Sequence, residues 1–286
     1  MNPALWGGVC ALSLGTADFM ARFSSQALNY RNALLGMLVA GAIVLTAYVA
    51  WSGPEFVWSA DTLWLIGLNG LATTAMTLLL YNGLARGPVT VVAPIVAAHP
   101  ALVLLLGVVL GSRPSLLQWA AMGVTIIGVV AVAYGAEEDA DARSYSADYI
   151  KRSIVIAVLA SLCYAVLVSA GQHAVPTHGQ LQTLWVGRLV SLTCLLLVFA
   201  GRRERPNVPV RWWPYVTLQG MLDAGGYLAL FAGSTGPRPE IAAVTASTFG
   251  AVTTLLAYFI LKERIVLIQW GGLGAVFAGV AVLSGT

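Results

Sequence analysis

Charged residues are scarce in this sequence. Asp, Glu, Lys and Arg make up 9% of the 286 residues, whereas 58% are hydrophobic. Soluble domains usually carry about 25% charged residues, so the composition excludes a globule with a water-exposed surface. It predicts a polytopic membrane protein whose surroundings are the lipid bilayer. The net charge is only +3 and the basic residues cluster at the ends of apolar runs, which argues for membrane topology and against nucleic-acid binding.

Cysteines and catalytic motifs are also scarce. Cys10, Cys163 and Cys194 lie far apart inside apolar segments, with no CxxC spacing, which predicts inert thiols rather than a disulfide or a metal site. The absence of a Walker A loop argues against ATP-driven transport by this chain. No HExxH or GxSxG motif is present and no cofactor is predicted. The first segment lacks a basic n-region and an A-x-A-like site, which predicts a spanning helix rather than a signal peptide.

The apolar runs are continuous rather than alternating. Strands of a membrane barrel alternate over about ten residues, whereas a spanning helix needs roughly 20 apolar residues. Charged, proline and glycine clusters divide the sequence into ten runs near that length. The sequence therefore predicts an all-α integral membrane protein with ten transmembrane helices at approximately 3–21, 32–51, 62–84, 89–110, 115–134, 152–174, 180–200, 212–231, 240–261 and 265–284.

The two halves of the sequence resemble each other. LLQWAAMGVTIIGVVAV (116–132) and LIQWGGLGAVFAGVAVL (267–283) share Leu, Gln-Trp and two glycines without a gap. Because the matching segments end the two halves, the pattern indicates duplication. The same offset aligns Arg113 with Arg264 and Pro88 with Pro239.

Five helices in each half is an odd number, so the second copy enters the membrane from the opposite side, as in an inverted repeat. The predicted units are a first repeat at 1–134, a hydrophilic connecting loop at 135–151 and a second repeat at 152–286. A complete inverted repeat can form a whole transport path, which favours a monomer.

The chain resembles the drug/metabolite transporter superfamily, in particular its ten-helix EamA-type exporters. The resemblance covers nearly the whole chain and rests on the duplicated Gln-Trp helices, the Leu-Lys-Glu-Arg turn (261–264) and GTADFMAR (15–22). The turn of the first half, Leu-Gly-Ser-Arg (110–113), lacks the glutamate that the family often has. The resemblance implies two interlocked five-helix bundles around a central cavity and export of small metabolites such as amino acids.

Lys and Arg are distributed unevenly between the two sides of the predicted bundle. By the positive-inside rule, the loops that follow the odd-numbered helices are cytoplasmic, and both termini are extracytoplasmic in a cell (inner) membrane. Several members of the family resembled keep both termini inside; we follow the charge count, because local charge sets orientation. The basic residues of the odd loops are Arg22, Arg31, Arg86, Arg143, Lys151, Arg152, Arg202, Arg203, Arg205, Arg211, Lys262 and Arg264.

Asp223 lies in a strongly apolar run, GMLDAGGYLAL (220–230). A carboxylate inside the membrane costs roughly 2.5–3.5 kcal/mol on insertion scales. Arg188 lies at a matching depth in the preceding segment, about 8 residues or ~12 Å from the same face. Either the two charges neutralise each other and fix helix packing, or they line a cavity and bind a substrate or a coupling proton. Tyr227 lies one turn beyond Asp223 and shares its face.

His99 and Asp18 are the other ionisable candidates. His99 lies near the midplane between two prolines, Pro94 and Pro100, which bend a helix and free backbone carbonyls. It titrates near physiological pH when unperturbed, although a packing histidine is the commoner case. Asp18 lies near the predicted inner end of the first helix, where an i,i+4 ion pair with Arg22 is a sufficient structural explanation.

The remaining cavity candidates are polar or aromatic residues, each of which also has a packing or anchoring interpretation. Trp185 precedes Arg188 by three residues and is therefore expected on the same face. An aromatic lining suits an apolar or aromatic substrate. These candidates are Trp185, Tyr81, Asn82, Tyr164, Ser247 and Thr248.

The leading functional hypothesis is a secondary transporter that exports a small metabolite, such as an amino acid, by alternating access. The alternative is a membrane-embedded enzyme acting on lipid or peptide substrates, which needs a catalytic constellation. Asp18 and Asp223 are predicted at opposite depths, which argues against an aspartyl pair and for a protein that is not an enzyme. A channel fits less well, because it requires rings of like polar residues.

Overall fold

The apolar runs are helical, because a helix satisfies its own backbone hydrogen bonds in lipid. The computed structural model describes residues 2–138, 146–234 and 239–285, and this part of the chain contains helices and no strand. The ten predicted runs are all helical, and a 3-10 turn, Val210–Trp212, precedes the eighth. The helices are α1 Pro3–Leu28, α2 Tyr30–Ser52, α3 Ala60–Arg86, α4 Val89–Ala97, α5 His99–Val109, α6 Leu116–Glu138, α7 Ala147–His178, α8 Gln180–Gly201, α9 Trp213–Ser234, α10 Pro239–Ala246, α11 Phe249–Ile260 and α12 Leu267–Gly285.

Nine spans in the described chain are long and apolar enough to cross a membrane, with α4 and α5 forming one span and α10 and α11 another. The one predicted span outside these nine is α9, the eighth along the chain. It has 22 residues, which is long enough to cross the membrane. It is less apolar because it carries Gln219 and Asp223. This polar content is tolerated because both side chains face other helices rather than lipid.

The fourth and ninth predicted helices are each broken near the middle, whereas the sequence predicts a single helix at each of these positions. Ala98 separates α4 from α5, and Pro100 at the start of α5 lacks the N–H that would continue the helix. Between α10 and α11, hydroxyl groups bond backbone carbonyls instead: Ser247 Oγ donates to Val244 O (2.7 Å) and Thr248 Oγ1 donates to Thr245 O (2.7 Å). Such broken helices occur in membranes where they line a cavity.

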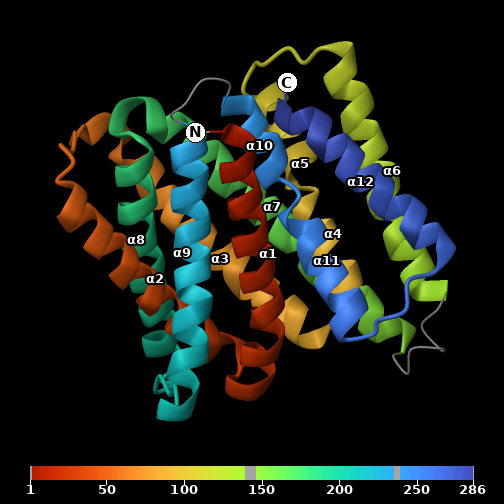
Figure 1. Cartoon of the computed structure of the whole chain (residues 1–286), viewed down its shortest axis with the longest axis horizontal. Coiled ribbons are helices and arrows are strands. Elements are labelled where there is room, and N and C mark those ends of the chain that lie inside the picture. Colours follow the sequence, from red (N-terminus) through yellow and green to blue (C-terminus); the bar gives the residue numbers. More distant parts are fainter. Residues whose placement is uncertain (1, 139–145, 235–238, 286) are drawn as a thin grey trace.

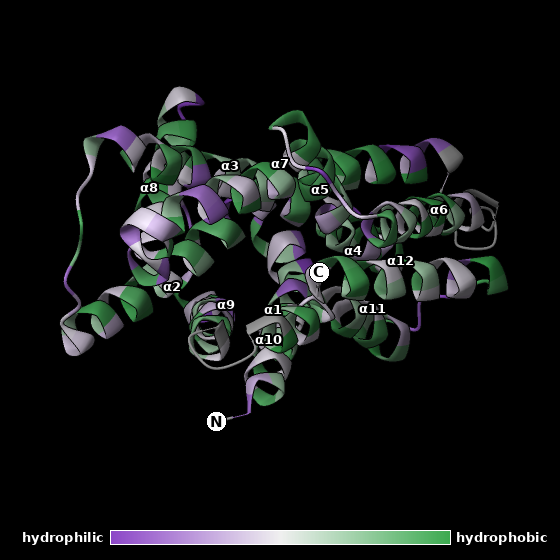
Figure 2. Ribbon diagram, turned by 90° about the horizontal axis from the view of Figure 1, so that it is seen from above, coloured by the Kyte–Doolittle hydropathy of each residue, from purple (hydrophilic) through white to green (hydrophobic). Residues whose placement is uncertain are grey.

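The two inverted five-helix repeats interlock around a central cavity. The first repeat comprises α1 to α6 and the second comprises α7 to α12. The first helix of each repeat packs on the third helix of the other, in the pairs α1–α9 and α3–α7, and the broken helices follow the same rule, with α10 and α11 on α1 and with α4 and α5 on α7. The last helices, α6 and α12, pack on each other at one end of the molecule (Figures 1 and 2). The core is therefore shared between the repeats.

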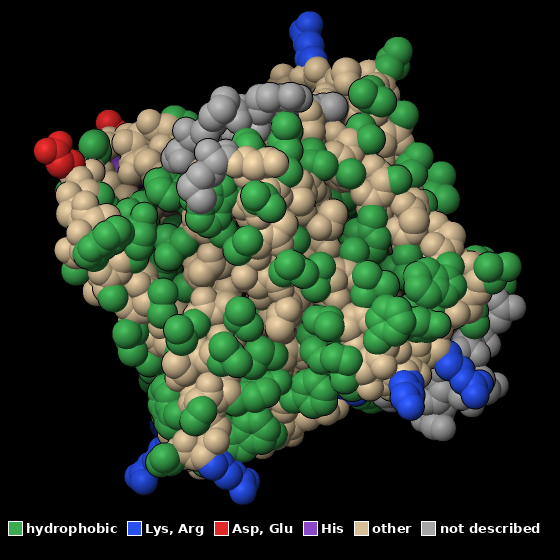
Figure 3. Space-filling view, viewed as in Figure 1, with side chains coloured by type: hydrophobic (Ala, Val, Ile, Leu, Met, Phe, Trp, Pro, Cys, Tyr) green, Lys and Arg blue, Asp and Glu red, His purple; other side chains and the backbone are tan. Residues whose placement is uncertain are grey.

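The molecule has two polar faces, one at each end of its helices. We call the end at which α1 begins and α12 ends the termini face, and the opposite end the basic face (Figure 1). Figure 3 shows Lys and Arg side chains mainly toward the lower end and also at the upper edge, with hydrophobic side chains covering the wall between; on the termini face Arg113 is exposed. The exposed cations of the basic face are Lys151, Arg152, Arg202, Arg203, Arg205, Arg211, Lys262 and Arg264.

Glycine permits a close helix crossing between α6 and α12. A Cβ atom at Gly128 would lie 2.7 Å from the carbonyl oxygen of Gly272, and one at Gly272 would lie 2.8 Å from the carbonyl oxygen of Gly128. The two backbones therefore touch, as small residues allow in membrane helices. Gly274, two residues further along α12, has open space in the direction of a Cβ.

Gly272→Leu is expected to lower the thermal unfolding midpoint of the detergent-solubilised protein, whereas Gly274→Leu leaves it nearly unchanged. The first substitution forces two backbones apart, and overpacking costs about 1–3 kcal/mol or more. The second adds an apolar side chain in open space on the same helix. Thermal melts followed by size-exclusion chromatography measure both, and equal midpoints for the two variants would contradict the crossing.

Candidate functional site

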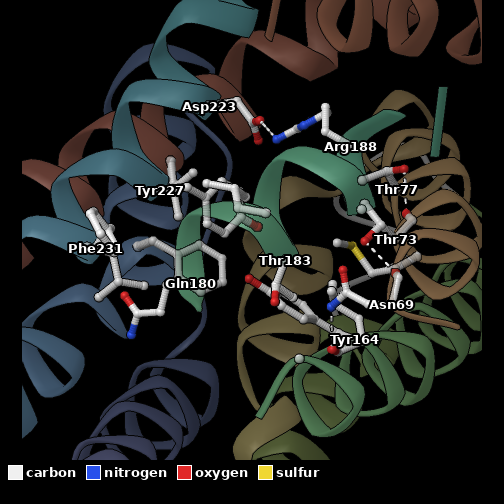
Figure 4. A pocket seen from close by; sticks show the side chains of 18 of the residues that line it. Asn69, Thr73, Thr77, Tyr164, Gln180, Thr183, Arg188, Asp223, Tyr227 and Phe231 are labelled. Carbon is white, nitrogen blue, oxygen red and sulfur yellow. Dashed lines mark hydrogen bonds and ion pairs between the residues drawn. The ribbon is translucent and has the colours of Figure 1, made fainter. Parts of the chain in front are cut away.

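A cavity of about 350 Å³ lies between the two repeats and is lined by both of them. At its termini-face end lie Gln180, which begins α8, and Phe231, near the end of α9. At the other end lies Tyr81, near the basic-face end of α3. Figure 4 shows the lining side chains, with a charged part around Asp223 and Arg188 and a polar part around Thr73 and Asn69. The cavity has the size and mixed lining of a small-molecule site.

Arg188 and Asp223 form an ion pair in the cavity wall, at the matching depth expected from the sequence. The side chain of Arg188 is 4% exposed and that of Asp223 is 17% exposed, so the pair is desolvated. Nη2 of Arg188 donates to the carboxylate, and Nη1 contacts the sulfur of Met37 (3.6 Å), a weak acceptor. A guanidinium has five N–H donors, so this arrangement leaves donors for the carboxylate of a ligand.

Asp18 also lines the cavity, which corrects two expectations from the sequence. Arg22 does not pair with it, because Nη1 of Arg22 donates to the carbonyl oxygens of Leu84 (2.7 Å) and Ala85 (2.9 Å) at the end of α3. Nor do Asp18 and Asp223 lie at opposite depths: their charges are close enough to interact. The reason is that α1 continues to Leu28 rather than ending near residue 21, which places Asp18 near the middle of the helix.

A row of polar residues on α3, which packs on α8, also lines the cavity and was missed in the sequence. Asn69, Thr73 and Thr77 line the cavity at intervals of four residues, a spacing that places them on one helix face. Their hydrogens are used internally: Asn69 Nδ2 donates to Leu167 O (2.8 Å), Thr73 Oγ1 to Asn69 O (2.8 Å) and Thr77 Oγ1 to Thr73 O (2.7 Å). Their remaining oxygen lone pairs suit the donors of a ligand, such as an ammonium group.

A second cavity, of about 810 Å³, adjoins the first and reaches the termini face. Its lining includes Arg113 and Ser284 near that face, and it shares Tyr164, Tyr227 and other residues with the first cavity. The two cavities are therefore neighbouring parts of one region between the repeats.

His99 lies in the wall of the second cavity, at the break between α4 and α5. Its ring stacks on Tyr164, with 3.8 Å between the centroids and 7° between the planes, and Nδ1 lies 3.2 Å from the carbonyl oxygen of Val96. Nδ1 donates in this contact, because a carbonyl oxygen can only accept.

Several other candidates do not reach either cavity. Trp185 turns to α2, where Nε1 donates to Thr46 Oγ1 (3.0 Å), and its ring stacks on Phe56. A helix face is wide enough for residues three apart to diverge, so Trp185 and Arg188 contact different neighbours. Asn82 and Thr248 are also absent from both linings, whereas Ser247 lines the second cavity.

Buried hydrogen bonds close the cavity toward the basic face. Gln219 Nε2 donates to the hydroxyl oxygen of Tyr81 (2.6 Å), and Ser24 Oγ donates to Gln219 Oε1 (3.0 Å). Ser24 and Gln219 are fully buried. The described cavity is therefore closed on the basic face while its lining reaches the termini face.

Comparison with known proteins decides the family. The sequence model of the EamA-like transporter family matches residues 1–134 and 151–285. The chain belongs to this family. It is thus a multi-pass membrane transporter of small molecules, which confirms the resemblance to the drug/metabolite transporter superfamily. No curated protein matches the sequence.

Solved structures support the same fold. One of them, described as "Crystal structure of protein", superposes with a TM-score of 0.66 over 98% of this chain and 95% of its own, at 17% sequence identity. At this identity the likeness concerns the fold alone, so the substrate of the transporter has to be argued from its own cavity.

Asp223→Asn is expected to reduce transport more than membrane insertion, and a second variant separates folding from function. The single substitution leaves Arg188 buried without a counter-charge, which costs about 3–5 kcal/mol when a pair is broken in a protein interior. The double variant Arg188→Met, Asp223→Asn removes both charges and is expected to recover most of the thermal midpoint, with transport still reduced at least tenfold. Native transport by the double variant would show that the pair is structural.

Proposed function

We propose that this chain is a secondary transporter that exports a small zwitterionic metabolite, foremost amino acids, by alternating access through the central cavity. The observation that carries the proposal is the Arg188–Asp223 pair, which lies in the wall of a cavity between two inverted repeats of a transporter family. In inverted-repeat transporters the substrate site lies near the midplane at the repeat interface; this pair lies near the middle of α8 and α9, in the lining of the cavity between the repeats.

The distribution of polar groups supports a zwitterion. Arg188 has N–H donors beyond those that contact Asp223 and Met37, which suits a carboxylate in the bidentate geometry of guanidinium groups. Asp18 and the oxygens of Thr73 and Thr77 suit an ammonium group. Because the carboxylate and ammonium of an amino acid are separated by one carbon atom, such a ligand engages Arg188 and a nearby oxygen acceptor of the same lining at once.

The apolar part of the lining supports an aromatic or apolar side chain on that substrate. Tyr164, Tyr227, Phe231 and Phe249 line the same cavity, together with several leucines. Aromatic rings stack on one another and give large contact areas. A strongly charged side chain would have to lose its hydration against this wall.

Asp18 is the group that we propose to carry a coupling proton. Its carboxylate lies in the cavity lining and makes no ion pair with the described residues, whereas Asp223 is neutralised by Arg188. The ionisable side chains that face it are Asp223 and Arg188 from the second repeat, with Tyr81, Tyr164 and Tyr227 around them. Two carboxylates beside one guanidinium favour uptake of a further positive charge.

Transport fits this site better than the alternatives. An aspartic enzyme needs two carboxylates that share a proton, whereas Asp223 is already engaged by Arg188. A channel requires rings of like polar residues in an open pore, whereas this cavity is closed at its floor by Ser24, Gln219 and Tyr81. One chain supplies both walls of the cavity, which supports a monomer.

The orientation in the membrane follows from the charged surface. The exposed cations gather on the basic face, and positive loops remain in the cytoplasm. We therefore propose that the basic face is cytoplasmic and that the termini face is extracytoplasmic, in the inner membrane. In this orientation the cavity described above is open to the outside.

The proposed function predicts saturable counterflow of neutral amino acids with aromatic or apolar side chains in proteoliposomes. Labelled amino acids, nucleosides and cationic drugs are offered outside vesicles that contain the same unlabelled compound. Exchange is expected for the amino acids and not for the drugs, because Arg188 requires a carboxylate. A flux that rises linearly with concentration would indicate a channel, and exchange confined to cationic drugs would overturn the zwitterionic substrate.

In the same vesicles, Asp18→Asn is expected to abolish accumulation driven by a pH gradient while leaving counterflow within about threefold of the native rate. The amide cannot exchange a proton, but exchange at equal pH requires none. His99→Gln serves as the matched control, because His99 is the other ionisable group in the cavity region. Gradient-driven accumulation that survives Asp18→Asn and is lost in His99→Gln would move the coupling proton to His99.

A further inference from the structure

Glu263, in the turn between α11 and α12, holds the beginning of α4 on the basic face. Its Oε1 accepts a hydrogen bond from Val89 N (3.0 Å), and its Oε2 accepts from Thr90 N (2.8 Å) and Thr90 Oγ1 (2.8 Å). Val89 and Thr90 are buried, and the N-cap residue, Pro88, provides no side-chain cap. A carboxylate from the second repeat therefore satisfies the free N–H groups of a helix in the first repeat, where the helix dipole also favours an anion.

The turn that presents Glu263 has an unusual backbone. Lys262 has φ of 52°, in the left-handed region that residues other than glycine rarely adopt. Lys262 directly follows the C-cap of α11, a position at which helices commonly adopt this conformation, as Arg203 does after α8. The reversal ends α11 and lets the next residue, Glu263, reach the start of α4.

Glu263 is one of several contacts between the repeats on the basic face. Glu204 of the second repeat pairs with Arg31 of the first (2.9 Å), and the hydroxyl of Tyr149 donates to the carbonyl oxygen of Arg86 (3.1 Å). Glu204 and Arg31 are partly exposed, and such pairs contribute little. Glu263 differs because it caps buried backbone groups, so opening the face requires the loss of its bonds.

The corresponding position on the termini face has no carboxylate. The offset that aligns Arg113 with Arg264 places Ser112 on Glu263. Ser112 lines the second cavity, and its N–H donates to the carbonyl oxygen of Gly107 within its own turn (2.8 Å). The face with the carboxylate is closed and the face with the serine is reached by the cavity. The inverted repeat is symmetric in its helices but asymmetric at this pair of turns.

We propose that Glu263 is the latch of the basic-face gate: its bonds to the start of α4 keep the cavity closed on that face and break when the cavity opens there. The proposal rests on the proposed alternating access. When the gate opens, water replaces Glu263 at Val89 N and Thr90 N. Because the equivalent turn, Leu-Gly-Ser-Arg (110–113), carries no carboxylate, the ligand-free protein rests with its cavity open toward the termini face.

The test measures from which face the cavity is reached. Thr73→Cys places a thiol in the cavity wall, in a variant whose Cys10, Cys163 and Cys194 are replaced by Ala. A membrane-impermeant maleimide is applied to right-side-out and to inverted membrane vesicles. With Glu263 present, labelling is expected from the termini face; Glu263→Gln is expected to raise labelling from the basic face relative to the termini face by about tenfold, or ~1.4 kcal/mol.

Two further variants make the result specific to the latch. Arg264→Gln changes the charge of the exposed neighbour in the same turn and is expected to leave the labelling ratio unchanged. Thr90→Val removes the hydroxyl that donates to Glu263 Oε2 without changing the charge. It is expected to shift the labelling ratio in the same direction by a smaller factor. If Glu263→Gln does not fold, Thr90→Val decides the outcome.

The labelling ratio and counterflow report separate claims. A folded Glu263→Gln variant with the native ratio, or an equal shift in Arg264→Gln, overturns the latch and leaves the proposed function intact if counterflow persists. If the native protein shows no counterflow while Glu263→Gln shifts the labelling ratio, the proposed cargo is overturned and the latch is supported.

Discussion

The low polarity of the bilayer is the constraint on which this structure depends. Every polar group at membrane depth needs a partner inside the protein, and the described chain gathers such groups where its two repeats meet. Arg188 pairs with Asp223, Asn69 of α3 bonds the backbone of α7, and Gln219 joins α9 to Tyr81. Lipid-facing surfaces are left to apolar side chains. The proposed substrate site therefore lies in the core that the two repeats share.

The interlocked packing of the two repeats explains how one cavity can open alternately toward two faces of the protein. Each repeat's first helix packs on the third and broken helices of the other, so movement of one repeat alters the cavity wall contributed by both. The breaks in α4–α5 and α10–α11 divide these walls into halves that lie toward opposite faces. Glu263 bridges one such half to the other repeat, whereas its counterpart, Ser112, remains within its own turn. In the proposed latch, this difference between the two turns favours opening toward the termini face.

Much of the architecture was accessible from the sequence because the membrane imposes it. The lengths of the apolar runs predicted the spanning helices, and the matching depths of Arg188 and Asp223 predicted their ion pair, which the structure contains. The site was predicted less completely. Asn69, Thr73 and Thr77 were missed although their spacing of four residues was visible, because threonine is common in lipid-facing helices as well. Trp185 was placed in the cavity from helical periodicity, which identifies a face but does not identify the neighbour that the face contacts.

The sequence by itself determined the class of protein, the helices and the duplication, because hydropathy and spacing are local properties that the bilayer converts directly into spans. Only the tertiary structure decided which polar groups meet. In the structure α1 continues to Leu28, so that Asp18 lies near Asp223. Arg22 bonds the end of α3 rather than Asp18, and Glu263 bonds the start of α4. These contacts join residues far apart in the chain, and their partners are chosen by helix packing between the repeats, which hydropathy does not encode.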